Sequence, residues 1–128
     1  MAHIPTVLSQ TKLTGKKGEE LALNFLLKKG FKILELNFKS RYGEVDIIAQ
    51  RDEILFFVEV KTRRNDNFGK PFEAVNIAKQ KKIVGCALYY TKLRNATDKD
   101  LRFGVVSILL LSEENFEIEW IEDDFNLS

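Results

Sequence analysis

The sequence predicts an α/β domain with a central mixed β-sheet flanked by helices, in the order α-β-β-β-α-β-β. Five segments are apolar and of strand length, and two segments have the composition and spacing of helices. The links between the first three expected strands are short, which is typical of hairpins. The chain has 128 residues, so we expect a single domain (1–128) with its own core.

The first helix is expected at about 14–29. Gly30 follows Lys28 and Lys29, and a glycine after basic residues is typical of a helix C-terminus. Residues 1–12 before this helix are expected to be a loose N-terminus.

Three strands are expected next, at 31–38, 43–50 and 53–63. The links "SRYG" and "RDE" are short enough to favour antiparallel hairpins. The segment 65–71, "NDNFGKP", is rich in residues that form turns.

The second helix is expected at about 71–91, with Pro71 at its start. Two further strands, "RFGVVSILLL" and "FEIEWIE", complete the expected fold, and 112–128 forms an acidic C-terminal strand and tail. Strands that are joined through a helical crossover imply a mixed sheet with helices packed on it.

Composition excludes several kinds of site. Cys86 is the only cysteine and His3 the only histidine, so an internal disulfide, a cysteine-based zinc site and a histidine cluster are excluded. We expect Cys86 to be a small core residue. The longest apolar run, 108–111, is too short to cross a bilayer, and the N-terminus has no secretory pattern. These features predict a cytoplasmic protein without a membrane partner.

Charge is unevenly distributed along the chain. Residues 112–128 contain seven acids and no base, which leaves 20 bases and 12 acids in 1–111. A basic body favours a polyanionic partner such as a nucleic acid. The alternative is that the Lys and Arg side chains only solvate the surface.

Two neighbouring strands carry acids among apolar residues. In "FFVEVKTRR", Glu59 and Lys61 share one face, because side chains alternate along a strand. In "GEVDII", the same alternation puts Asp46 on one face with Glu44 and Ile48. If the strands pair, Asp46 and Glu59 come within reach of one cation, and oxygen ligands favour Mg²⁺ or Mn²⁺.

Carboxylates, a metal ion and an adjacent ammonium are the parts needed for phosphodiester hydrolysis. Nearby carboxylates favour the charged form of Lys61, so we expect it to orient water or stabilise the transition state. The alternative is that Glu59 and Lys61 form a surface pair worth ~0–1 kcal/mol, and that Asp46 is an ordinary acid near a turn.

The first helix adds another acid. Ala22, Leu23 and Leu26 follow Glu19 at helical spacing, so Glu19 is expected to lie toward the apolar face. Gly18 would allow the helix to approach the sheet closely. Glu19 could then support a metal through water or bind the lysine, or it could simply be an acid favoured by the helix dipole.

Basic residues near these strands are candidates for phosphate contacts. They are Arg63 and Arg64 after the third strand, Lys79 on the second helix and Arg41 before the second strand. Arg41 and the adjacent Tyr42 could also stack on a base, although a plain hairpin turn explains them equally well.

The motifs "GxxGE", "GEVDII", "FVEVKTR" and "FG-P-EAV" occur in this order between Gly15 and Val75, within a resemblance that covers roughly residues 12–111. With this ordered set of motifs, the chain resembles the YraN-type family of small bacterial proteins. That family is similar in fold to restriction endonucleases of the PD-(D/E)xK type and to archaeal Holliday-junction resolvases. The resemblance implies a restriction-endonuclease-like fold and a possible homodimer. It also implies that Glu19, Asp46, Glu59 and Lys61 are the nuclease core.

One departure from the family is Gly104, where the family commonly has aspartate in "RFD". The acidic residues, Lys61 and the family resemblance together predict a Mg²⁺-dependent nuclease acting on DNA, with branched or damaged DNA as candidate substrates. A non-catalytic nucleic-acid-binding module and a protein-interaction adaptor are the alternatives.

Overall fold

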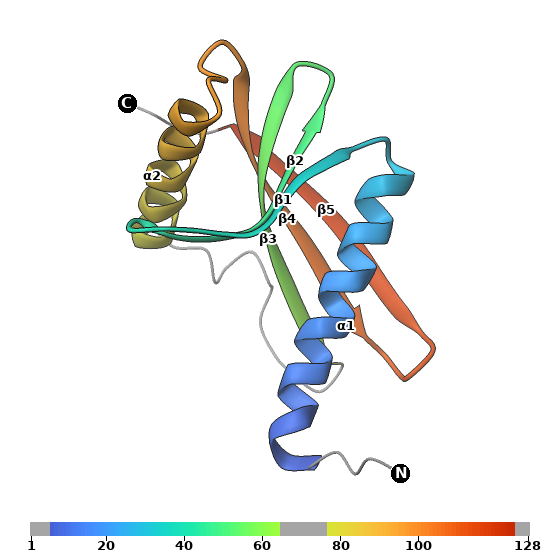
Figure 1. The fold of residues 1–128 in the computed structure, drawn as a ribbon. Helices are drawn as coiled ribbons and strands as arrows, with labels where there is room; N and C mark the ends of the chain where they lie inside the picture. Colours follow the sequence, from blue (N-terminus) through green and yellow to red (C-terminus); the bar gives the residue numbers. More distant parts are fainter. Residues whose placement is uncertain (1–5, 65–76, 125–128) are drawn as a thin grey trace.

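The computed structural model describes residues 6–64 and 77–124. In this part of the chain, a five-stranded mixed sheet is flanked by two helices, in the predicted order α-β-β-β-α-β-β (Figure 1). The elements are α1 (Thr6–Lys28), β1 (Lys32–Ser40), β2 (Gly43–Arg51), β3 (Ile54–Arg64), α2 (Ile77–Leu93), β4 (Asp100–Leu110) and β5 (Phe116–Asp124).

The strands lie in the sheet in their order along the chain, β1-β2-β3-β4-β5. β2 pairs antiparallel with both β1 and β3, and β5 pairs antiparallel with β4. β3 and β4 are parallel, because the chain crosses back through α2 between them. The expected hairpins and the expected mixed sheet are therefore confirmed.

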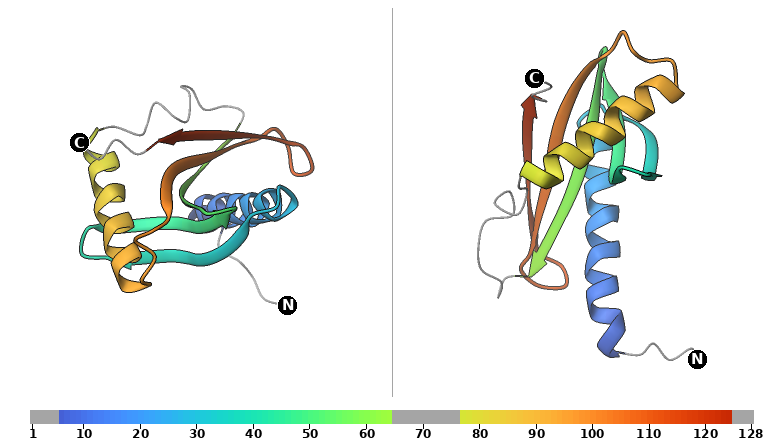
Figure 2. Two further views of the ribbon diagram at one scale, coloured as in Figure 1. Left: turned by 90° about the horizontal axis from the view of Figure 1, so that it is seen from above. Right: turned by 90° about the vertical axis from the view of Figure 1, so that its left-hand side faces the viewer.

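The core consists of two layers, one on each face of the sheet. Phe56 and Val58 pack in the layer that contains α1, whereas Leu55 and Phe57 pack in the layer that contains α2. Successive residues of β3 enter opposite layers because strand side chains alternate. The two helices accordingly lie on opposite faces of the sheet (Figure 2).

α1 begins at Thr6, eight residues before the predicted start, so residues 6–12 belong to the helix that they were expected to precede. Its C-terminus is where the sequence places it. The Phe31 N–H donates to the Leu26 carbonyl (3.0 Å) and the Gly30 N–H to that of Leu27 (3.1 Å). Gly30 has a φ of 89°, which a glycine adopts without strain, so these bonds close the helix.

The other boundaries lie close to the predicted ones. α2 is described from Ile77 to Leu93, and the expected helix start at Pro71 and the turn-rich segment 65–71 lie outside the described residues. Cys86 is 1% exposed in the core, as predicted. Among the described helices, none is both long and apolar enough to span a membrane.

Gly104, on β4, lies against an aromatic side chain of β5. A Cβ atom at this position would be 2.2 Å from Cη2 of Trp120, far inside van der Waals contact. The Trp120 ring also packs on Phe31 and Phe56, with ring centroids 5.4 and 5.9 Å apart. The absence of a side chain at residue 104 thus makes room for Trp120 in the core.

Candidate active site

The candidate site lies where β2 and β3 separate. Their ladder runs from the pair Arg51 and Ile54 to the pair Ile47 and Val58. Beyond it, the Val60 N–H donates to Oδ2 of Asp46 at 2.8 Å. A carboxylate therefore takes the place of a main-chain acceptor, which satisfies a donor that the parting strands would leave unpaired.

β2 is irregular at this point, so the expected alternation over residues 44–48 is wrong. Val45 packs in the layer of α2, whereas Ile47, two residues later, packs in the layer of α1. Asp46 lies between them, opposite Asn37 of β1, whose φ is 51°. The Asp46 side chain reaches β3, where it accepts the Val60 N–H.

Glu59 and Lys61 lie next to this fork on β3. Glu59 is buried, with 8% of the residue exposed, and its Oε1 atom is 3.3 Å from Nζ of Lys61. The Lys61 side chain is 25% exposed, so the ion pair lies at the edge of the core and is open in part to solvent. This contact is not the exposed surface pair that was the alternative for these two residues.

α1, which packs on one face of the sheet, brings Glu19 near enough for its charge to act on Asp46. Gly18 is buried, and a Cβ atom there would be 1.8 Å from Oγ1 of Thr62 on β3, which shows how closely the helix approaches the sheet. Glu19 itself is exposed and does not face the core as expected, because Gly18 occupies the position nearest the sheet. The helix-dipole explanation is wrong, because α1 begins 13 residues earlier, at Thr6.

Burial, and to a lesser extent the neighbouring carboxylates, change the protonation of Asp46. Burial raises the pKa of the Asp46 carboxyl from 3.8 to about 6, while the hydrogen bond from Val60 opposes this shift. The charges of Glu59, Glu19 and Glu44 raise the pKa further. The site therefore concentrates negative charge at a partly buried position, and a cation there would offset it.

The ligands fit a hard cation that keeps much of its water. Asp46 and Glu59 offer only oxygen atoms, and Mg²⁺ usually retains several waters and binds one or two carboxylates. In the described part of the chain, no group of three or more His, Cys, Asp or Glu side chains is arranged to hold a metal. A metal here would therefore depend on these two carboxylates, water and substrate.

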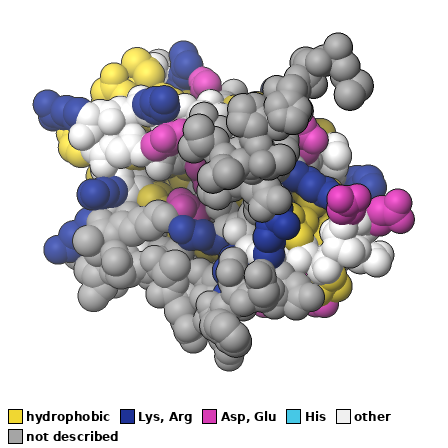
Figure 3. All heavy atoms as spheres, turned by 90° about the horizontal axis from the view of Figure 1, so that it is seen from below, with side chains coloured by type: hydrophobic (Ala, Val, Ile, Leu, Met, Phe, Trp, Pro, Cys, Tyr) yellow, Lys and Arg dark blue, Asp and Glu magenta, His cyan; other side chains and the backbone are white. Residues whose placement is uncertain are grey.

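The basic candidates are spread around the site. Arg41 is exposed at the tip of the β1–β2 hairpin, where its Nη2 donates to the Tyr42 hydroxyl at 2.9 Å. Arg63 is partly buried and Arg64 exposed at the end of β3, and the side chain of Lys79 lies outside the described ones. Seen from below, Lys and Arg side chains recur over this face with acidic ones among them (Figure 3).

The sequence reasoning missed two contributors to the site. The main-chain N–H of Val60 fixes the orientation of Asp46, and Thr62 is the residue of β3 against which Gly18 of α1 packs. No sequence signal reveals a main-chain donor, since every residue except proline has one. The Gly18 contact had a signal in the glycine itself, but its partner on the sheet had none.

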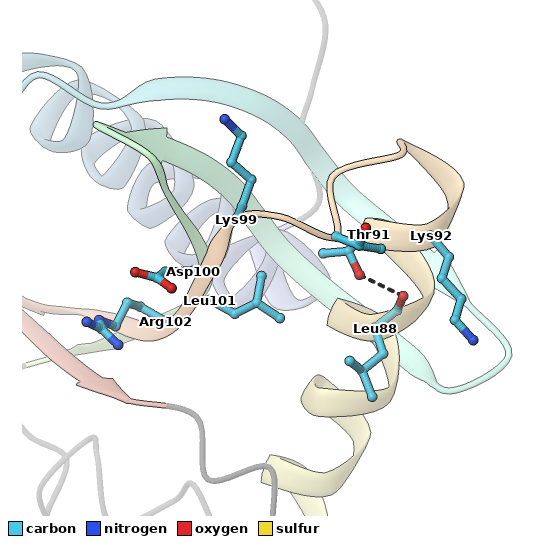
Figure 4. A pocket seen from close by; sticks show the side chains of 8 residues that line it. Leu88, Thr91, Lys92, Lys99, Asp100, Leu101 and Arg102 are labelled. Atoms are coloured by element: carbon cyan, nitrogen blue, oxygen red, sulfur yellow. Dashed lines mark hydrogen bonds between the residues drawn. The ribbon is translucent and has the colours of Figure 1, made fainter.

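A cavity of about 390 Å³ lies near the start of β4, away from these residues (Figure 4). Asp100 pairs with Ile54, seven residues before Lys61, which is about 23 Å along the strand. The side chains of Lys92 and Lys99 point away from one another in this cavity, and Lys99 pairs with Glu53. It thus has no converging set of reactive groups. Its lining residues are Leu88, Thr91, Lys92, Thr97, Lys99, Asp100, Leu101 and Arg102.

Comparison with protein-family models shows to which family the chain is related. The model described as "Uncharacterised protein family UPF0102" matches residues 18–108, a range that contains Glu19, Asp46, Glu59 and Lys61. The chain belongs to the UPF0102 family. The resemblance to YraN-type proteins is thereby confirmed.

Several UPF0102 proteins are similar over most of their length. The one from Clostridioides difficile (strain 630) is 46% identical over 99 residues, which cover 77% of this chain and 87% of the relative. The one from Clostridium perfringens (strain SM101 / Type A) is 41% identical over 117 residues, 91% of this chain and 96% of the relative. The one from Caldicellulosiruptor bescii is 46% identical over 116 residues, 89% and 98% of the two chains.

Proposed function

We propose that this UPF0102 protein is a metal-dependent phosphodiester hydrolase that acts on nucleic acid, with DNA as its substrate. The observation that carries the proposal is the arrangement at the fork of β2 and β3. Asp46 is held by the Val60 N–H, its pKa is raised to about 6, and the adjacent Glu59 holds Lys61. Two carboxylates and an ammonium at one partly buried position are suited to a phosphate and a hard cation.

Each residue has a distinct task in this proposal. Asp46 and Glu59 would bind Mg²⁺ or Mn²⁺, which supplies Lewis acidity and a more acidic bound water when present. The Val60 N–H fixes the orientation of Asp46. Lys61, positioned by Glu59 at 3.3 Å, stabilises the negative charge that develops on the phosphate and orients the attacking water. Glu19 adds negative charge from α1 and so favours the cation.

The proposal extends to the finer fold and to the setting of the protein. The five-stranded mixed sheet with a helix on each face is compatible with a restriction-endonuclease-like fold similar to that of archaeal Holliday-junction resolvases. A two-fold dimer would suit a symmetric branched DNA. A DNA substrate in a bacterium would be met in the cytoplasm, which is the location we propose.

A second function is favoured by one observation. Among the residues that the structure describes, no cluster of three or more potential ligands is arranged to hold a metal. A protein of this fold that binds nucleic acid without cutting it would need no such cluster. This alternative predicts binding that is unaffected by EDTA.

The test is cleavage of labelled single-stranded, duplex, flap and four-way-junction DNA in Mg²⁺, Mn²⁺ or EDTA. Wild-type protein would be compared with Asp46→Asn and Lys61→Ala, purified identically. Lys28→Ala is the matched control, because Lys28 is an exposed lysine at the far end of α1. We expect metal-dependent cleavage by the wild type and the control, and a loss of at least about 100-fold in both site variants.

The outcomes separate the two functions. Cleavage that persists equally in both site variants would show a contaminating nuclease and refute the assignment. If nothing is cut but DNA is bound in EDTA, the binding module is correct. If DNA is neither cut nor bound, both functions fail.

A further inference from the structure

An aromatic cluster lies where the tip of the β1–β2 hairpin crosses α2. It consists of Phe38, Tyr42 and Tyr89, and we call it the aromatic patch. The Tyr89 ring is 6.2 Å from that of Phe38 and 6.4 Å from that of Tyr42, measured between centroids. Tyr42 is 39% exposed and Tyr89 43% exposed, so two large aromatic side chains meet solvent side by side.

The two exposed rings differ in what already covers them. Tyr42 lies against α2, since a Cβ atom at Gly85 would be 2.9 Å from its Cγ. The guanidinium of Arg41 lies over the same ring, 5.0 Å from the centroid, and donates to its hydroxyl. Tyr42 is thus covered in part by Arg41 and α2, whereas Tyr89 packs on the rings of Phe38 and Tyr42 and leaves much of its surface exposed. The stacking of Tyr42 on a base stays a prediction from the sequence, and Tyr89 is the more exposed of the two rings.

The surroundings of the aromatic patch are basic. Residues 39–44 at the hairpin tip and 80–93 on α2 contain five Lys and Arg residues and one acid, Glu44. Lys82 lies beside the hairpin turn, since a Cβ atom at Gly43 would be 3.6 Å from its Cβ. Positive charge next to an exposed aromatic ring is complementary to a nucleic-acid strand, which offers phosphates and base faces together.

The aromatic patch is also close to the candidate active site. Gly43, at the hairpin turn, and Asp46, at the fork, are three residues apart on β2, which is about 10 Å. A strand that reaches the fork can therefore extend over the hairpin tip to α2.

We propose that Tyr89 is a stacking platform for an unpaired base of a single-stranded segment next to the scissile phosphate, a role that rests on the proposed nucleic-acid substrate. Bases inside a duplex are stacked on both faces, so along the length of a strand only an unpaired base can offer its face to this ring. Arg41 and Lys82 contact the phosphates on either side. Single-stranded DNA is accordingly the preferred form of substrate near the site.

The test is the affinity of an oligo-dT strand and of a blunt duplex, both measured in EDTA at low salt so that nothing is cut. Tyr89→Leu keeps a side chain that covers Phe38 but removes the aromatic face, and Tyr89→Phe keeps the face but removes the hydroxyl. Leu88→Ala is the matched control, since Leu88 is the adjacent residue on α2 and is 46% exposed.

We expect Tyr89→Leu to weaken oligo-dT binding about 5- to 100-fold. Tyr89→Phe and Leu88→Ala should remain near the wild-type affinity, and duplex binding should not change. The proposal is overturned if the wild type does not bind oligo-dT, or if Tyr89→Leu binds it as tightly as the wild type. It is also overturned if Tyr89→Leu weakens binding of the duplex equally, or if Tyr89→Phe weakens oligo-dT binding as much as Tyr89→Leu does. Because binding is read without cleavage, a failure of the hydrolase proposal would leave this result unaffected.

Discussion

Replacing Asp46 with asparagine is expected to raise the free energy of unfolding at neutral pH, although Asp46 is a candidate catalytic residue. The carboxyl has a pKa of about 6 in the folded protein and 3.8 as its ordinary value. A rise of about two pKa units means that ionised Asp46 costs the folded state up to ~3 kcal/mol at pH 7. Asparagine avoids this charge, and its side-chain oxygen can still accept the Val60 N–H.

The pH dependence follows from the sign of the shift. The folded state binds the proton more tightly than the unfolded state, so stability is highest below about pH 3.8 and falls as pH rises through about 6. Asp46→Asn removes this dependence. The variant should therefore exceed the wild type at pH 7.5 by ~1–3 kcal/mol, and the difference should vanish near pH 4.

Urea unfolding at the two pH values, in EDTA, measures this difference. The control is Asp52→Asn, since Asp52 is an exposed turn residue with a φ of 57° that asparagine also tolerates, and its effect should stay within about 0.5 kcal/mol. Added Mg²⁺ should stabilise the wild type and not Asp46→Asn. An Asp46→Asn protein that is less stable than the wild type at pH 7.5 would refute the reasoning.

Two further predictions concern close contacts in the core, both read from urea unfolding. Gly18→Ala should lower the free energy of unfolding by about 1–3 kcal/mol, because its Cβ atom would lie 1.8 Å from Oγ1 of Thr62. Adding Thr62→Ala should recover part of this loss. A Gly18→Ala protein as stable as the wild type would contradict the close approach of α1 to the sheet. Gly104→Ala should cost about the same, because its Cβ atom would meet Trp120 at 2.2 Å. The double variant Gly104→Ala/Trp120→Leu should lose less free energy of unfolding than the sum of the losses of the two single variants. If the two losses simply add, the contact between these residues is refuted.

Much of the fold was predictable because the decisive signals are local. Gly30 closes α1, and the short links after β1 and β2 specify hairpins. The long strand Ile54–Arg64 followed by a helical segment indicates a crossover to a parallel neighbour. The start of α1 at Thr6 was not predictable, because the segment before Gly15 has no clear helical pattern of apolar residues.

The candidate site was predictable in composition and only partly in geometry. Alternation along β3 correctly puts Glu59 beside Lys61, because that strand is regular. Alternation fails for Asp46, because Val45 and Ile47 on either side of it pack on opposite faces of the sheet, and the residue types in this strand give no signal of that irregularity. The exposure of Glu19 depends on which α1 residue seats on the sheet, and that is likewise a tertiary contact.

The contact between Gly104 and Trp120 constrains the order in which these two positions can change. A chain that gained the tryptophan while a side chain still occupied residue 104 would have been overpacked, whereas loss of that side chain first would have left a void that the indole could fill. The reverse route has the same barrier, so introducing aspartate at residue 104 alone is disfavoured for as long as Trp120 remains. We therefore expect UPF0102 proteins with aspartate at this position to have a smaller side chain opposite it, so that the two positions covary.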